Sequence, residues 1–409
     1  MEFLKKHAKW SLGYFLVAAL LGAGLRIYHW VPFPINYKFI VHTHSHIALL
    51  GWGYVALTTV IYTSFLKDAG AGKRYGRIFL ATQLSLLGML CTFPFQGYGL
   101  FSIIFSTLFL FVSYIFAWFF IKYTPAKFKT SHSYRLLRAS LGYMILSSLG
   151  PWALGGIMNT LGPASDWYRI AIYFYLHFQY NGWMLMALLG LFFYVAEQAK
   201  LIIPGSWFRS FYRILNAAVI LSFFLSVLWT APAWYIYAGS GLGAGLQCLA
   251  FFMLGNFLFR WAAVFRNLFS PTNRYLLVLT GLLLAAKVLM QLLTSLPYFS
   301  RLAASIPELI IGYLHWTFLG VISIWLFVLL DHFQLLRLPV AALRLYLAGF
   351  LLTEAMIFYK GIAAWAGLAA FDGYFASLAL ASLIFPIALA GGFFNRQQGG
   401  QDVLPGDRP

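Results

Sequence analysis

Twelve long apolar runs constrain the fold of this chain more than any other feature. A helix needs roughly 20 apolar residues to cross about 30 Å of hydrocarbon, and runs of that length recur along the sequence. Approximately, they are 10–29, 37–65, 77–96, 99–121, 136–157, 167–195, 210–231, 235–263, 274–296, 305–331, 340–359 and 369–394. The short alternation of a barrel strand is missing, so backbone hydrogen bonds have to be satisfied within each run. We therefore expect an all-α integral membrane protein with twelve transmembrane helices.

Composition supports this class. Hydrophobic residues make up 62% of the 409 residues and charged residues 9%, whereas soluble domains are nearer one half and one quarter. The net charge of +18 comes from short loops between apolar runs, so it indicates membrane orientation rather than nucleic-acid binding. Cys91 and Cys248 lie inside apolar runs, which argues against a disulfide framework or a cysteine metal site.

The distribution of lysine and arginine predicts the orientation. Of the 28 such residues, 22 fall on the side of the N-terminus, five fall on the opposite side, and Lys287 lies within a run. The positive-inside rule then places both termini in the cytoplasm of a bacterial-type inner membrane. The basic segment Met1 to Lys9 has no small-residue cleavage signal and is expected to be retained. Residues 395–409 are rich in glycine, glutamine and proline, and we expect them to be a disordered cytoplasmic tail.

Histidines recur at regular intervals within the apolar runs. His42, His44 and His46 lie in the second run, His177 in the sixth and His315 in the tenth, and His46, His177 and His315 are each followed by glycine five positions later. The intervals from His46 to His177 and on to His315 are 131 and 138 residues. Each lies about ten residues from the non-cytoplasmic end, a depth of about 15 Å. We expect one domain, 1–394, of three pseudo-symmetric four-helix arcs, 1–130, 131–268 and 269–394.

Ionisable residues at this depth are candidates for function, and neutral imidazole is a common metal ligand. Two histidines facing each other can hold haem iron, and a nearby glycine leaves room for a flat porphyrin. On the second helix His42 and His46 share one face and His44 points nearly opposite, so the axial ligand stays open among the three. Tyr180 and Tyr313 lie near the histidine level, and Glu308 lies two turns before His315 on the same face. The catalytic residue is left open, with these three as candidates.

The pattern resembles subunit I of the haem-copper oxidase superfamily, which includes oxygen-reducing oxidases and nitric oxide reductases. The segment from His42 to Gly51 is similar to helix 2 of the C-type oxidases and nitric oxide reductases, and read from His44 it is similar to NnrS proteins, as is His315-Trp316 with Gly320. The resemblance implies twelve helices in three arcs. It also implies a low-spin haem b held by His315 and one of the helix 2 histidines, with His177 at a position that supplies a copper ligand.

The sequence departs from that family at the copper site. The seventh run, Phe211 to Thr230, has no histidine, and the tenth has one histidine where the family has two. The family's cross-linked tyrosine position is Asn181 here, with Tyr180 one residue short. A standard three-histidine copper site is therefore not expected, and copper itself is left open among the possible metal ligands His46, His177 and His315.

Several functions remain open. The main expectation is a haem-b-binding membrane protein that transfers electrons or handles O2 or NO, with a quinol or cytochrome donor and possible partner subunits. A second is a nitric oxide reductase or quinol-linked oxidase whose site uses His177, Tyr180 and Tyr313. A third is a metal or haem transporter lined by His44, His177 and His315, and a fourth is a cofactor-free assembly subunit.

Overall fold

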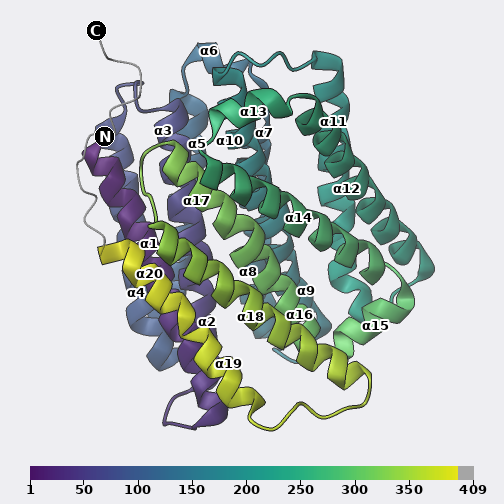
Figure 1. Ribbon diagram of the computed structural model, residues 1–409. Helices are drawn as coiled ribbons and strands as arrows, with labels where there is room; N and C mark the ends of the chain where they lie inside the picture. The colour runs from purple at the N-terminus through teal and green to yellow at the C-terminus, as the bar shows by residue number, and fades with distance from the viewer. Residues whose placement is uncertain (395–409) are drawn as a thin grey trace.

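A computed structural model describes residues 1–394 (Figure 1). Helices make up 86% of the structure, with no strand in the described part, and twelve of them are long and apolar enough to cross a membrane. The expectation of an all-α, multi-pass membrane protein is confirmed. The expectation of a disordered tail falls on residues 395–409, outside the described range.

The helical elements follow one another with short connections, and some spans combine two or three elements. Segments η1, η2 and η4 are π-helical and η3 is a 3₁₀ helix. In chain order the elements are α1 (Glu2–Trp30), α2 (Tyr37–His46), η1 (Ile47–Tyr54), α3 (Val55–Phe65), α4 (Gly72–Gln96), α5 (Leu100–Tyr123), α6 (Ala126–Lys129), α7 (His132–Ser147), α8 (Leu149–Thr160), α9 (Asp166–His177), η2 (Phe178–Met184), α10 (Leu185–Gln198), α11 (Gly205–Leu221), η3 (Ser222–Thr230), α12 (Trp234–Arg260), α13 (Ala262–Leu268), α14 (Pro271–Thr294), α15 (Pro297–Ser305), α16 (Pro307–His315), η4 (Trp316–Ser323), α17 (Ile324–His332), α18 (Val340–Trp365), α19 (Tyr374–Ser382) and α20 (Ile384–Phe394).

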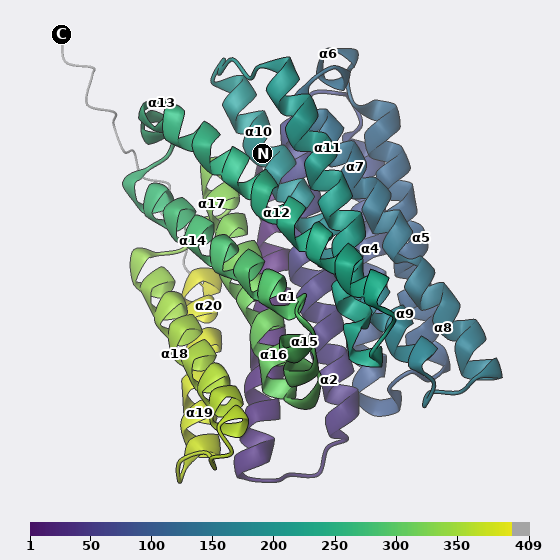
Figure 2. The ribbon, with the colours of Figure 1, turned by 90° about the vertical axis from the view of Figure 1, so that its right-hand side faces the viewer.

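The spans run side by side as one bundle, with α6 and α13 at the end that carries the N-terminus and α15 at the other (Figures 1 and 2). We call these the proximal and distal ends. The short helices α6, α13 and α15 were not expected, because their length is below that of a hydropathy span. Helix α1 begins at Glu2 rather than near residue 10, since its lysines stay helical and Lys9 lies 5.1 Å from the Phe393 ring centroid.

Three spans form the centre of the bundle. In the most apolar 18-residue stretch of each span, the share of buried residues is 94% for Tyr37–Phe65, 89% for Asp166–Gln198 and 72% for Pro307–His332. In the corresponding stretches of the other nine spans of the described part, the share does not exceed 50%. The second, sixth and tenth spans, which carry the recurring histidines, are therefore shielded by the remaining helices.

Each central span changes from α- to π-helix at an equivalent place. The π-helical segments start directly after His46, His177 and His315. A π turn contains one residue more than an α turn. Such turns are rare in proteins as a whole, but those that occur are often found at functional sites. The irregularity therefore marks the same level of all three central spans.

Glycines inside the π segments allow close packing against aromatic rings. A Cβ added to Gly51 would lie 2.7 Å from the Tyr14 side chain, and one added to Gly182 would lie 2.6 Å from that of Tyr143. The two tyrosines also bond alike: Tyr14 donates to Gln83 Oε1 at 2.9 Å, and Tyr143 donates to Asn216 Oδ1 at 3.0 Å. The first span is thus joined to the third in the same way as the fifth is joined to the seventh.

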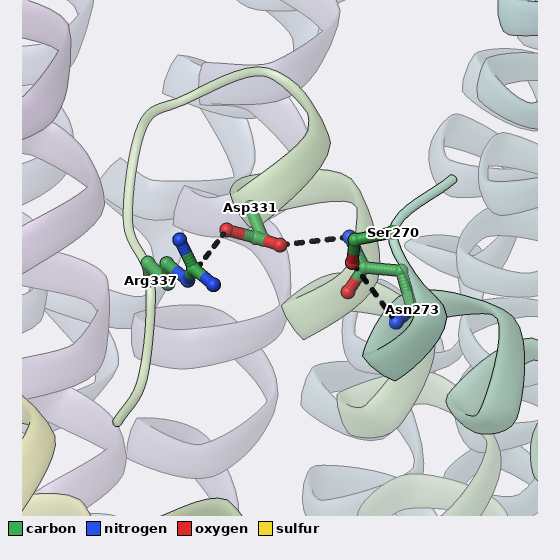
Figure 3. A network of polar contacts seen from close by, with 4 residues as sticks. All are labelled: Ser270, Asn273, Asp331 and Arg337. Carbon is green, nitrogen blue, oxygen red and sulfur yellow. Dashed lines mark hydrogen bonds and ion pairs between the residues drawn. The ribbon is translucent and has the colours of Figure 1, made fainter. Parts of the chain in front are cut away.

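A small polar network ties the proximal ends of α14 and α17 together (Figure 3). Ser270 caps α14 by accepting from the Asn273 backbone N–H at 3.2 Å, and the Asn273 side chain donates to Asp331 Oδ2 at 2.7 Å. Arg337 Nε lies 3.7 Å from Asp331 Oδ1, but 67% of the arginine side chain is exposed, so the amide bond is the stronger link. This network fixes where the tenth span leaves the bundle.

Candidate functional site

The three histidines His42, His44 and His46 lie in α2, whose N-terminus is capped by a side chain. The Asn36 side chain accepts from the Phe39 backbone N–H and caps α2. The hydroxyl of Thr43 donates to the Phe39 carbonyl, and that of Ser45 donates to the Val41 carbonyl. Both polar side chains are therefore satisfied within the helix. The histidine rings are then free to face neighbouring helices.

His44 on α2 and His315 on α16 are brought together across the bundle. Their ring centroids are 6.4 Å apart and the ring planes meet at 76°. Two imidazoles bound to one metal from opposite sides, with bonds of about 2.0 Å, have centroids roughly 6 Å apart once the ring radii are added. The pair therefore has the spacing of two axial ligands to a single metal atom.

One nitrogen of His44 is held by α1. Nδ1 donates to the Ala18 carbonyl at 2.9 Å, an arrangement that fixes the tautomer and directs Nε2 away from α1. Metal-bound histidines commonly donate their other N–H to a carbonyl in this manner. Gly22, one turn further along α1, makes room for the ring: a Cβ there would lie 2.9 Å from His44 Cε1.

His315 is not satisfied by the protein. Its Nδ1 is buried and has no hydrogen-bond partner among residues 1–394. The next residue, Trp316, donates its indole N–H to the Leu283 carbonyl at 2.9 Å and so holds the end of α16 against α14. A packing histidine in an apolar bundle would be expected to have its polar atoms paired, and this ring does not follow that expectation.

His42 and His46 face the opposite side of α2, as their helical spacing predicts. His46 stacks on Phe93 of α4 with a centroid distance of 4.5 Å, and its Nδ1 donates to the His42 carbonyl at 2.8 Å. The His42 ring meets Tyr98 edge-on at 4.7 Å. These two candidate ligands thus lie toward α4, and the structure leaves His44 as the α2 histidine opposite His315.

His177 lies in a separate polar chain. Nε2 donates to the Val219 carbonyl at 2.8 Å, and the Asn181 amide lies 3.4 Å from Nδ1. Lys287 on α14 donates to Asn181 Oδ1 and to Gln291 Oε1, each at 2.7 Å. Both nitrogens of His177 are therefore occupied in this structure, and a metal there would have to displace one of these bonds.

Within residues 1–394 no group of three or more His, Cys, Asp and Glu side chains is placed to hold a metal ion. The predicted metal candidates His46, His177 and His315 face different neighbours: Phe93, Val219 and His44. Their role as metal ligands stays a prediction. Among residues 1–394, the rings of His44 and His315 lie 6.4 Å apart.

The three catalytic candidates separate into two places. Tyr180 and Tyr313 line a cavity of 610 Å³ near the distal end, together with His177. Glu308 instead forms an ion pair with Lys360 of α18 at 2.8 Å. Glu308 thus links α16 to α18 through this ion pair, whereas the two tyrosines line the same cavity as His177.

Two features of the site were not expected from the sequence. Ala18 and Gly22 of α1 support His44, yet apolar residues four apart carry no distinctive signal in a membrane helix. The second feature is the polar contact of Lys287 with Asn181 and Gln291. Lys287 and Gln291 lie four residues apart in an apolar span, and this spacing could have indicated a shared buried partner. Asn181 could not be assigned as that partner without the packing of α14 against η2.

Comparison with protein-family models and with curated proteins finds no match to this chain. The case for function therefore rests on the geometry of the side chains.

Proposed function

We propose that this chain is an integral membrane electron-transfer protein that holds one b-type haem between His44 and His315. The observation that carries the proposal is the 6.4 Å separation of two imidazole rings, one oriented by Ala18 and the other without a protein partner for Nδ1. Bound there, the haem would supply one-electron redox chemistry. Because His44 and His315 would both be engaged in holding the iron, the site favours electron transfer over binding of O2 or NO.

The surrounding residues fit such a group. Ala18, Gly22 and Arg26 follow one another at four-residue intervals on α1 and so lie on one side of that helix. Ala18 orients the ligand, Gly22 leaves space beside it, and Arg26 lies one turn nearer the distal end, where it can pair with an anionic propionate. The chain's own contribution is to orient the ligand ring, leave room and provide a counter-charge.

We also propose that the bundle consists of three related four-helix units, 1–130, 131–268 and 269–394. The π segments after His46, His177 and His315 support this, as do the matching Tyr14–Gln83 and Tyr143–Asn216 bonds. In this arrangement the third unit supplies one haem ligand and the first supplies the other. The second unit carries His177, whose nitrogens are engaged by protein, and this disfavours a continuous histidine-lined transport path.

The proposed location is a bacterial-type inner membrane with both termini cytoplasmic. Twelve spans return the chain to the end where it began, and Phe393 packs near Lys9 accordingly. The excess of lysine and arginine at the proximal end supports a cytoplasmic assignment for that end. The haem would then lie in the outer half of the bilayer.

An absorbance spectrum of the purified protein tests the proposal. Oxidised and reduced spectra with a pyridine haemochrome assay should give about one haem b per chain. His44→Ala and His315→Ala should each remove the low-spin signal, whereas His42→Ala, on the opposite face of the same helix, should retain it. A colourless parent protein, or an unchanged spectrum in both ligand variants, would refute the assignment.

A further inference from the structure

The 610 Å³ cavity has the size and wall of a ligand site. Small-molecule pockets typically span about 300–1,000 Å³ and are mainly apolar with a few placed polar groups. This cavity is enclosed by α9, η2, η3, α14, α15, α16 and α18, and it extends from Arg169 and Trp365 near the distal ends of their helices to Asn181 and Thr317 deeper in the bundle. Its two amide side chains, those of Asn181 and Gln291, lie toward that deep end.

The charge at the deep end is closed off from the cavity. Lys287 is 0% exposed, and its ammonium group donates to Asn181 and Gln291 and lies 5.7 Å from the Tyr313 ring centroid. The ammonium group is thereby solvated by two amide oxygens and an aromatic face. It is not one of the cavity-lining groups, and an anion in the cavity would not contact it directly.

What the deep end does present is neutral hydrogen-bond donors. Gln291 uses its oxygen for Lys287, which leaves its amide N–H groups, and Gln291 lines the cavity. Tyr180 also lines the cavity, and its ring packs edge-on against Phe318 with centroids 6.0 Å apart. Neither donor has a hydrogen-bond partner among the described residues, and neither atom is fully buried.

An apolar chamber with neutral donors at its inner end selects a neutral ligand with acceptor oxygens. A carboxylate would lose its hydration there without gaining an ion pair, which is costly. The cation that does line the cavity, Arg169, lies toward the mouth and packs on Trp229 at 5.2 Å. A flat ring bearing carbonyl oxygens and an apolar tail meets both requirements.

We propose that this cavity binds the head group of a membrane quinone, with Gln291 and Tyr180 donating to its carbonyl oxygens. Tyr313 and Leu314 line the cavity and directly precede His315, so a bound quinone would lie beside the helix that carries a haem ligand. Its role as redox partner of the haem rests on the proposed function. Binding itself depends only on the cavity.

Titration of the purified full-length chain with a short-chain benzoquinone, followed by tryptophan fluorescence, tests the proposal. Saturable binding is expected, and Gln291→Leu and Tyr180→Phe should each weaken it about tenfold, the loss of one well-placed hydrogen bond. Because a deep polar substitution can disturb folding, Ala303→Trp provides a second test. Ala303 lines the cavity from α15, and the larger side chain should abolish binding.

The matched control is Ser305→Trp, an exposed residue of the same helix that is not among the lining residues, and it should bind as the parent does. Unchanged affinity in Gln291→Leu and Ala303→Trp would overturn the proposal, as would displacement of the quinone by dodecanoate at equal concentration. The haem spectrum is recorded on each sample. A coloured protein that binds no quinone refutes this inference alone, and a colourless protein that binds quinone refutes only the haem proposal.

Discussion

Lys287 Nζ donates a 2.7 Å hydrogen bond to Oδ1 of Asn181, joining α14 to η2 in the interior of the bundle. The same ammonium group donates to Gln291, so two amide oxygens solvate a charge that has no carboxylate partner in an ion pair of the described structure. This link connects the ninth span to the sixth and, through Asn181, to His177.

Replacing Lys287 by alanine should lower stability markedly. The substitution leaves the oxygens of Asn181 and Gln291 without their donor in an apolar interior, a loss of about 3 kcal/mol. Thermal unfolding in detergent measures the effect, and Lys38→Ala, an exposed lysine on α2, is the control. A second step, Asn181→Leu in the Lys287→Ala background, should recover part of the loss; a further fall of equal size would contradict the coupling.

Gly22→Ala should disturb haem binding without unfolding the protein. The added Cβ would lie 2.9 Å from His44 Cε1 and force the ring to turn or shift. We expect the haem content after purification to fall severalfold, with an altered low-spin spectrum in what remains. Gly24→Ala is the matched control because a Cβ there would meet no neighbouring side chain or helix within 4 Å, and equal haem loss in both variants would disprove the steric explanation.

Gly51→Ala and Gly182→Ala should destabilise the chain by similar amounts. Each Cβ would press on the tyrosine of the preceding span at under 3 Å, and such overpacking typically costs about 1–3 kcal/mol. Gly142→Ala has open space around its Cβ and should be tolerated. Thermal midpoints compare the three, and a large loss in one π-segment variant with none in the other would contradict equivalent packing of the two units.

Glu354→Gln should change stability little, whereas Glu354→Leu should raise it. Glu354 is 2% exposed, and neither carboxyl oxygen has a hydrogen-bond partner in residues 1–394. Burying an unpaired polar group costs about 1–3 kcal/mol, which an apolar side chain of similar size avoids. Thermal unfolding of detergent samples decides between the outcomes, and destabilisation by both substitutions would indicate that the carboxyl group has a bonding role.

The number and course of the spans could be predicted because lipid leaves few choices for an apolar run. The start of α1 could not, since lysines that end a hydropathy window continue as helix. Helical spacing separated His44 from His42 and His46, but the preference for His44 depends on Ala18 and Gly22 of another span. The π segments were also beyond prediction, because apolar periodicity does not distinguish a π turn from an α turn over seven or eight residues.

The burial of the central spans has a consequence for biosynthesis. The most apolar 18-residue stretches of Tyr37–Phe65 and Asp166–Gln198 are 94% and 89% buried, yet their mean hydropathies of 1.4 and 1.2 are among the lowest of the twelve spans. Helices that pack against protein do not need an apolar surface all round, but they must still enter the bilayer before every neighbour has been made. During translation these spans depend on the helices already inserted beside them, so the order of synthesis is itself part of how the bundle closes around its histidines.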